Sequence, residues 1–158
     1  AFLWVCGGIQ LAGHAYIDSD GNHLPGVGIL DLETYAGDKR LIGNVVAEAD
    51  FDKYRFPIVG YENHIGRTML GSYVRPLAKI VEGYGNNGSS AEEGAIQQRV
   101  IGTYLHGPLL PKNPDLADVL LTWSLEHREG KKISLEPLAD PYTEAARAAT
   151  LRRSNAKR

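Results

Sequence analysis

The fold is decided by the stretch Phe2-Leu3-Trp4-Val5-Cys6-Gly7-Gly8-Ile9-Gln10-Leu11. Its first residues, Phe2–Val5, are apolar and too few for a helix, which predicts a buried strand. The only cysteine follows at once, and two glycines then open a segment that can begin a helix. A strand, a reactive side chain, a sharp glycine turn and a helix together make a nucleophile elbow. Backbone N–H groups at the helix start can favour a thiolate and hold an oxyanion, so we expect Cys6 to be a nucleophile.

A histidine at the end of a second strand supports this interpretation. A lone cysteine after an apolar strand is usually an inert core residue, so the elbow alone does not establish chemistry. The β-branched run that opens Val100–His106 predicts a strand, and Gly107-Pro108 ends it. Catalytic partners of a cysteine are adjacent in space rather than in sequence. His106 is therefore the expected partner of Cys6.

Composition bounds the class of protein. At 158 residues, with 43% hydrophobic and 23% charged residues, the chain is one ordinary globular domain in length. A net charge of -2 argues against nucleic acid, and no apolar run is long enough for membrane insertion. One cysteine and no signal peptide indicate the cytoplasm. Because the chain begins inside a strand and without Met, we expect sequence before Ala1 to be missing.

The remaining elements follow in order along the chain. Asn113, Pro114 and Asp115 start a helix of about 15 residues that ends near Gly130. A polar cluster at 62–68 ends a strand, where open α/β sheets build sites. The other predicted segments are a charged turn at 38–40, strands at 41–48, 56–61 and 77–81, a flexible loop at 83–90, and a terminal helix that begins near Pro141.

Several known binding motifs are absent. The acidic turn at 18–22 is not a calcium loop, because Ile29 stands where an EF-hand needs glutamate. The glycines at 26–28 do not form a dinucleotide fingerprint, and the loop at 83–90 lacks the lysine of a P-loop. Cys6, Glu62 and His64 have no metal-ligand spacing. The basic residues of the tail are too few to indicate a nucleic-acid site.

Three motifs, in this order, resemble the class I glutamine amidotransferases. Cys6–Gln10 fits the C-x-G-x-Q elbow of that class. Gly60–Thr68 is similar to the G-Y-E-x-H-x-G segment of its cobyric-acid-synthase-type branch, and Gly102–Gly107 to the catalytic-histidine strand of the same branch. The loop Gly83–Asn87 and the segment Tyr104–Pro114 further resemble the glutaminase subunits of lipid II-amidating synthases.

This resemblance covers Phe2 to about Trp123 and implies a fold. It is an α/β fold, an open flavodoxin-like, mostly parallel sheet flanked by helices, whose N-terminal half this chain lacks. Residues 1–139 would be the C-terminal part of the amidotransferase domain. Residues 140–158 would be a tail, helical and then frayed.

The resemblance also implies a reaction. Cys6 would attack the side-chain amide of L-glutamine to form a γ-glutamyl thioester, and His106 would activate the thiol and protonate the leaving ammonia. The Gly7 N–H would be one oxyanion donor, and Gln10 would help bind the substrate. Arg40 stands where related glutaminases bind the substrate carboxylate, since an arginine fork suits that group, although an exposed turn arginine is the equal alternative.

One departure concerns the group that orients the histidine. Many class I members carry an acid two residues after it, where this chain has Pro108. Two sources stay open: Glu62, with His64 as a further supporting residue, or a carboxylate from a synthetase partner. The partner would be a Mur-ligase-like subunit that binds ATP and Mg²⁺ and amidates the D-glutamate of lipid II. No cofactor or metal is expected on this chain.

Two other functions remain open. One is the amidotransferase domain of an enzyme that amidates cobyric acid or cobyrinate, which the Tyr-Gly-Asn-Asn loop disfavours. The other is a non-catalytic binding domain on the same fold, against which intact Cys6 and His106 argue.

Overall fold

The computed structural model of the protein describes residues 1–136, 138 and 140–155. Within these residues the helices are α1 (Gly7–Ala12), α2 (Leu109–Lys112), α3 (Pro114–Glu129) and α4 (Pro141–Asn155). The strands are β1 (Phe2–Val5), β2 (Ala15–Ile17), β3 (His23–Pro25), β4 (Leu32–Phe51), β5 (Tyr54–Leu70), β6 (Ala78–Glu82), β7 (Glu92–Glu93), β8 (Ala95–Gln97), β9 (Val100–Thr103) and β10 (Leu105–His106). None of the described helices is long and apolar enough to cross a lipid bilayer.

The strand that leads into Cys6 pairs in parallel with the strand that leads toward His106. β1 lies beside β9 with Val5 opposite Thr103, and β8 lies antiparallel on the other side of β9. Because parallel strands end at the same edge of a sheet, the residues after β1 and β9 emerge together. β1 is less buried than expected, with Phe2 59% exposed, because within the described residues only β9 flanks it.

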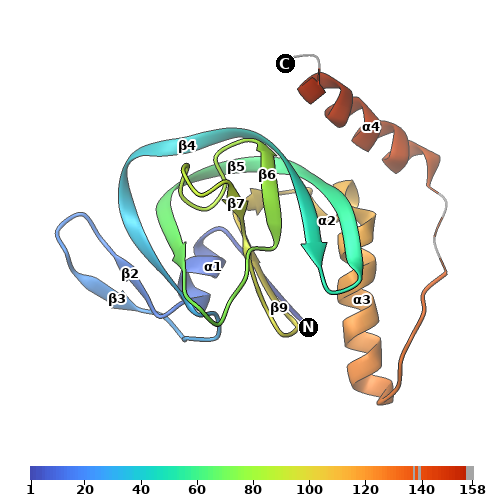
Figure 1. Cartoon of the computed structure of the whole chain (residues 1–158), viewed down its shortest axis with the longest axis horizontal. Coiled ribbons are helices and arrows are strands. Elements are labelled where there is room, and N and C mark those ends of the chain that lie inside the picture. Colours follow the sequence, from blue (N-terminus) through green and yellow to red (C-terminus); the bar gives the residue numbers. More distant parts are fainter. Residues whose placement is uncertain (137, 139, 156–158) are drawn as a thin grey trace.

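A second, larger sheet is built on two long strands. β4 and β5 form one antiparallel ladder from Leu32 opposite Leu70 to Phe51 opposite Tyr54. Both strands curve over the shorter strands and α1 (Figure 1). The expectation of a mostly parallel sheet is wrong for this chain. β4 and β5 are joined by a two-residue turn, which permits only antiparallel pairing, whereas a parallel pair needs a long crossover. The sheets are mixed, and helices flank them in an α/β fold.

Two segments differ from the sequence prediction because they lie inside these long strands. The charged turn predicted at 38–40 belongs to β4, whose pairing with β5 is interrupted between Ala36 and Leu41. The polar cluster predicted at a strand end, 62–68, lies within β5. The other predicted strand, 77–81, corresponds to β6, displaced by one residue.

Helix α3 packs its apolar side against the ends of the long strands. Leu116, Val119 and Trp123 belong to one buried cluster with Phe51 of β4 and Ile58 of β5. The Trp123 and Phe51 rings lie 6.2 Å apart. As predicted, α3 starts at Pro114 and stops before Gly130, which has a left-handed φ of 66°.

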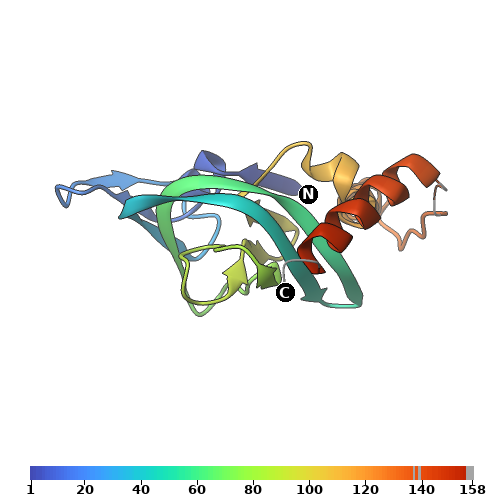
Figure 2. The same ribbon diagram turned by 90° about the horizontal axis from the view of Figure 1, so that it is seen from above.

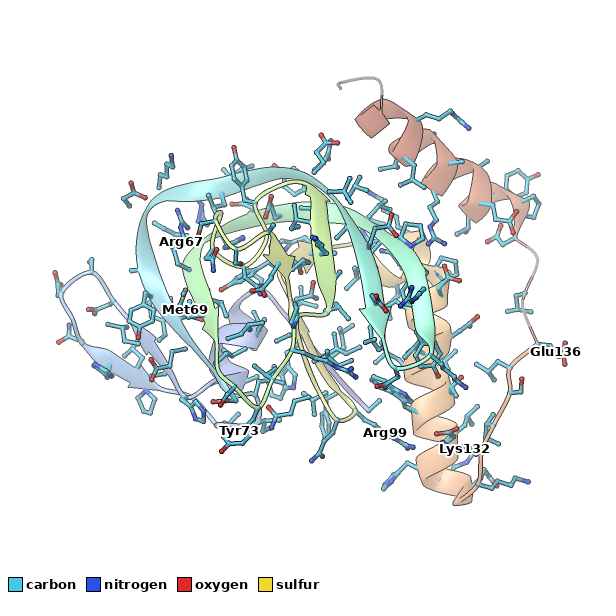
Figure 3. The ribbon with its side chains drawn as sticks, viewed as in Figure 1. Arg67, Met69, Tyr73, Arg99, Lys132 and Glu136 are labelled. Carbon is cyan, nitrogen blue, oxygen red and sulfur yellow. The ribbon has the colours of Figure 1, made fainter. Side chains whose placement is uncertain are left out.

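Arg99, in the turn between β8 and β9, joins the smaller sheet to α3. Its guanidinium donates hydrogen bonds to the Trp123 carbonyl and to the Glu126 carboxylate, both at 2.8 Å (Figure 3). At the far side of the molecule, the hairpin of β2 and β3 extends away from α3 and α4 (Figure 2). The elbow after β1 therefore lies between this hairpin and α3.

The tail is helical, as predicted. α4 begins after Asp140, whose carboxylate accepts hydrogen bonds from the N–H groups of Tyr142 and Thr143. Arg147 of α4 forms an ion pair with Asp115 of α3. The frayed end predicted for the tail falls partly on residues 156–158, which lie outside the described residues.

Candidate active site

Cys6 lies on the sharp turn between β1 and α1. Its backbone has φ 53° and ψ -111°, a conformation that costs a side-chain-bearing residue about 1–3 kcal/mol. The Cys6 N–H donates to the Thr103 carbonyl at 2.9 Å, which fastens the turn to the end of β9. The thiol is free and half-buried. A strained residue between a strand and a helix is the geometry of the predicted nucleophile elbow.

The space beside the turn is open. A hollow of about 300 Å³ is lined by Gly7, Gln10, Leu11, Tyr16, Leu24, Pro25 and Gly26. A Cβ atom on Gly7 would meet no atom within 4 Å. Within the described part of the chain, the Gly7 N–H makes no hydrogen bond. It is free to donate to a bound ligand, as an oxyanion donor must be.

His106 emerges at the same edge of the sheet as Cys6. It ends β10, opposite Tyr61 of β5, and follows Thr103, the residue that accepts the Cys6 N–H, by three positions. Its Nε2 atom is buried and has no hydrogen-bond partner among the described residues. The pairing of β1 with β9 thus directs the residues that follow both strands to one edge of the sheet. The unpartnered Nε2 atom of His106 is available to exchange a proton.

Shortly before His106, the chain passes from the smaller sheet to the larger one. β9 pairs with β1 as far as Thr103, and β10 pairs with β5 from Leu105. At this junction the buried Glu93 carboxylate accepts hydrogen bonds from the Thr103 hydroxyl at 2.5 Å and from the Tyr104 N–H at 3.0 Å. The Thr103 hydroxyl in turn accepts the Leu105 N–H at 3.0 Å. The junction is therefore fixed by side chains instead of a strand ladder.

Gln10 is held by a chain of buried hydroxyl groups. Its side-chain amide donates to the Tyr104 hydroxyl at 3.2 Å. That hydroxyl lies 2.6 Å from the Thr68 hydroxyl, which lies 2.8 Å from the Thr34 hydroxyl. Burial raises the pKa of Tyr104 above its ordinary value, so the hydroxyl keeps its proton and can take part in this chain. The amide of Gln10 is thereby oriented at the edge of the hollow.

His64 supports the same tyrosine from behind. The two rings stack with their centroids 3.7 Å apart and their planes 14° apart. His64 Nδ1 donates to the Gly66 carbonyl at 2.9 Å, and its Nε2 lies 3.5 Å from a Glu62 oxygen. His64 therefore contacts a residue that holds Gln10 and lies one layer behind the hollow.

Glu62 has a different environment from the one that an orienting carboxylate requires. Its two oxygens accept the N–H groups of Tyr84, at 2.7 Å, and Gly85, at 2.9 Å. No hydrogen bond joins Glu62 and His106 within the described ranges of the chain. The Glu62 carboxylate fastens the glycine-rich loop to β5, so the hypothesis that it orients His106 finds no contact in this structure.

Arg40 lies on the exposed bulge of β4. Its Nε donates to the Asn63 side chain at 3.2 Å, and it is not among the residues that line the hollow. The neighbouring Arg67, labelled on β5 in Figure 3, fastens the bulge by donating to the Lys39 carbonyl at 2.8 Å. Arg40 therefore lies at the surface, whereas Gln10 lines the hollow beside the elbow.

Sequence reasoning missed four residues of this arrangement: Thr68, Glu93, Thr103 and Tyr104. One signal was available in β5, where the residues 62, 64, 66 and 68 are buried and those between them are more exposed. This alternation of period two places a polar row on the inner face of a strand. No pattern in the sequence marked Glu93, because its partners are ten and eleven residues away.

The described residues contain no group of three or more His, Cys, Asp or Glu side chains that could hold a metal ion. The chemistry available at the elbow is that of a thiol, an imidazole and backbone N–H groups. These groups suit nucleophilic attack on a carbonyl carbon.

The mixed sheet and the strained cysteine define the class of α/β proteins that carry a nucleophile elbow. A family model of the CobB/CobQ-like glutamine amidotransferase domain matches residues 1–114. The chain belongs to this family.

Named relatives fall into two groups. GatD, a subunit of lipid II isoglutaminyl synthase (glutamine-hydrolyzing), from Staphylococcus aureus (strain N315) is 44% identical over 85% of this chain and 52% of the relative. The protein of the same name from Streptococcus pneumoniae R6 is 37% identical over 87% of this chain and 53% of the relative. A probable cobyric acid synthase from Methanothermobacter thermautotrophicus is 38% identical over 65% of this chain and 22% of the relative.

The chain spans about half the length of the two GatD relatives. Among solved structures, a glutamine amidotransferase matches with a TM-score of 0.45 and 17% identity, over 83% of this chain and 61% of that one. A glutamine amidotransferase from Thermotoga maritima matches with a TM-score of 0.44 and 14% identity, over 98% of this chain and 56% of that one.

Proposed function

We propose that this chain is the catalytic part of a glutaminase that hydrolyses L-glutamine and supplies ammonia to a Mur-ligase-like partner. The observation that carries the proposal is the strained elbow at Cys6, fastened to the strand end that precedes His106. Membership of the glutamine amidotransferase family and 44% identity to a GatD subunit support it.

The proposed reaction is a two-step acyl transfer. The Cys6 thiol loses its proton to His106, and its sulfur attacks the side-chain amide carbon of glutamine. The tetrahedral oxyanion accepts a hydrogen bond from the Gly7 N–H. The C–N bond then breaks as His106 passes the proton to the nitrogen that leaves as ammonia. Water then attacks the thioester carbon while His106 takes a proton from it. The C–S bond breaks, glutamate is released, and His106 returns the proton to the Cys6 sulfur. Gln10 holds the substrate in the hollow beside the elbow.

The rest of the proposed assembly lies outside this chain. ATP and Mg²⁺ belong to the ligase partner, which uses the ammonia to amidate the D-glutamate of lipid II. The site is cytoplasmic, where glutamine and ATP are available. A carboxylate of the partner orients His106, because the Glu62 carboxylate is already occupied by the loop at 84–85. Arg40 binds the substrate carboxylate only if the bulge of β4 moves toward the hollow.

The experiment is glutamate release from glutamine, measured on the complete protein with and without its ligase partner. Release that the partner stimulates, and that Cys6→Ser and His106→Ala both abolish, supports the proposal. Full activity without the partner contradicts an orienting group supplied in trans. No release under any condition favours a binding domain that keeps the fold.

A second candidate is the amidotransferase part of a cobyric acid synthase. The 38% identity to the archaeal protein of that name favours it. The two candidates share the glutaminase step and differ in the acceptor. Transfer of the amide nitrogen of ¹⁵N-labelled glutamine to lipid II, and not to a corrinoid carboxylate, decides for the first candidate.

A further inference from the structure

Glu93 is a fully buried acid that the proposed reaction does not use. It lies in β7, and its Oε1 atom accepts two hydrogen bonds, from the Thr103 hydroxyl and the Tyr104 N–H. The other oxygen, Oε2, is buried and has no hydrogen-bond partner in the described part of the molecule. A buried polar atom without a hydrogen-bond partner lowers the stability of the folded protein. Such violations are expected at functional sites.

The position of Glu93 suggests what the buried carboxyl does for the protein. Its two donors are the Thr103 hydroxyl and the Tyr104 N–H, which lie at the junction where the chain leaves β9 and enters β10. The Thr103 carbonyl accepts the Cys6 N–H at 2.9 Å. One carboxyl group therefore fixes the residue that holds the elbow and the peptide that leads to His106.

No strand ladder replaces these contacts. β9 and β10 pair with different strands in different sheets, and Tyr104 lies between them. Without the Glu93 carboxyl, the Tyr104 N–H and the Thr103 hydroxyl lose their acceptor, and the Thr103 hydroxyl that accepts the Leu105 N–H is no longer held in place. A displacement of a catalytic group by about 1 Å is enough to reduce a rate by about a hundredfold.

We infer that Glu93 is a positioning residue that sets the geometry of the Cys6–His106 pair through Thr103 and Tyr104. The inference rests on the proposed glutaminase function and adds a residue to it. Glu62 and His64 are the other titratable groups that act on Glu93, from β5. Their own contacts lead to the loop at 84–85 and to the Tyr104 ring, so neither duplicates the contact of Glu93 with the junction.

The test compares Glu93→Ala with Glu92→Ala in the complete protein assembled with its partner. Glu92 is the neighbouring acid of the same strand, and it lies on the opposite face of that strand because successive side chains alternate. Glu93→Ala should lower kcat by about ten- to a hundredfold with KM for glutamine changed by less than about threefold. Glu93→Gln, whose amide oxygen can accept both hydrogen bonds, should recover kcat to within about threefold of wild type.

A second readout follows Cys6 directly. The rate of thiol alkylation by iodoacetamide, measured against pH, reports how His106 is placed beside the thiol. In Glu93→Ala this profile should move to higher pH, whereas Glu92→Ala should keep the wild-type profile. Thr103→Val removes the hydroxyl link at nearly constant shape and should show the same two changes, which keeps the test available if Glu93→Ala does not fold.

Each outcome decides one question. Wild-type kcat and a wild-type alkylation profile in Glu93→Ala, or in Thr103→Val, overturn the positioning role while the glutaminase function stands. No glutamate release by the wild-type complex overturns the glutaminase function. The alkylation profile then still decides whether Glu93 sets the geometry of Cys6 and His106.

Discussion

Cys6 is held in a conformation that a residue with a side chain adopts at a cost. Its φ of 53° with ψ of -111° lies where glycine is the ordinary occupant. A nucleophile elbow uses such a turn to present its reactive side chain, and here the turn lies beside the open hollow that Gly7 lines. Stability and reactivity are therefore opposed at this one position.

The strain at Cys6 predicts that a glycine at this position is more stabilising than an alanine, which is the reverse of their usual order. Glycine usually destabilises a protein by about 0.5–1 kcal/mol relative to alanine. At position 6 we expect Cys6→Gly to be more stable than Cys6→Ala by about 1 kcal/mol, because glycine relieves the backbone strain. Urea denaturation of both variants measures the difference. A Cys6→Ala variant that is the more stable of the two would show that the turn is unstrained.

Glu93 predicts a dependence of stability on pH. Burial raises the pKa of the Glu93 carboxyl from its ordinary value of 4.5 to about 7. Between these values the folded protein holds a proton that the unfolded chain has released, so the free energy of unfolding falls as pH rises through this range. Stability from this group is fully present below pH 4.5 and lost above about pH 7.

The variant Glu93→Gln cannot ionise and isolates this effect. The stability of wild type relative to Glu93→Gln should fall by on the order of 1–3 kcal/mol between about pH 5 and about pH 8. Urea denaturation at several pH values measures it, with Glu92→Gln as the control that shows no such trend. A constant difference between wild type and Glu93→Gln would mean that Glu93 ionises in the folded protein as it does in the unfolded chain.

At the residue scale, the sequence predicted what a motif encodes locally. The elbow at Cys6 and the strand-end position of His106 follow from short patterns of apolar, glycine and β-branched residues. The contacts of Glu93 and Tyr104 do not, because they depend on which strands meet. Glu62 was predicted as one possible orienting residue for His106, but its two oxygens accept the N–H groups of Tyr84 and Gly85, in a loop that follows it by about twenty residues.

The start of helix α3 was predicted correctly at Asn113, but the sequence did not reveal the main structural role of this residue. Asn113 was expected to cap the helix, yet its side chain makes no capping hydrogen bond. It is fully buried, exchanges two hydrogen bonds with the backbone of Val59, and donates to the Leu109 carbonyl. Asn113 thus joins α3 to β5.

We expect Asn113→Ala to lower the free energy of unfolding by about 2–4 kcal/mol, because buried backbone groups of Val59 and Leu109 lose their partners. Thermal or urea denaturation measures the loss. Asn44→Ala, at an exposed position of β4, is the matched control and should change stability by less than about 0.5 kcal/mol. Equal effects of the two substitutions would refute a joining role for Asn113.

At the scale of elements, the sequence predicted where the strands lie more accurately than where they begin and end. Predicted strands at 41–48 and 56–61 are parts of β4 and β5, which extend well beyond them. The charged residues at 38–40 resemble a turn in sequence, and only the pairing of β4 with β5 converts that segment into a bulge. Local composition does not specify such pairing.

At the scale of the whole molecule, the parallel pairs β1–β9 and β2–β4 agree with the expected sheet, whereas the other strand pairs among the described residues are antiparallel. The antiparallel ladders join residues that are close in sequence, and they carry the polar inner face of β5 up to the elbow. The sequence motifs were sufficient to predict the family. They did not predict the curvature of β4 and β5, which depends on long-range packing.

The tail helix α4 lies against α2 and β5, and its half-buried Arg147 links it to α3 and β5 by hydrogen bonds. Arg147 pairs with Asp115 and donates to the Pro57 carbonyl. Arg147→Ala should make α4 more susceptible to limited proteolysis while residues 1–130 stay resistant, because an unpacked helix opens locally. Arg152→Ala, at an exposed position, is the control. Equal cleavage rates for wild type and Arg147→Ala would show that this contact does not hold α4.

The most direct test of the central claim is covalent capture of the nucleophile. The complete protein with its partner is treated with a glutamine-analogue electrophile, and the modified residue is located by mass spectrometry. The account predicts one adduct, on Cys6, which glutamine suppresses by competition, which Cys6→Ser abolishes and which His106→Ala slows. No adduct, or an adduct on another residue that forms equally well in Cys6→Ser, would contradict the assignment of Cys6 as the nucleophile of a glutaminase.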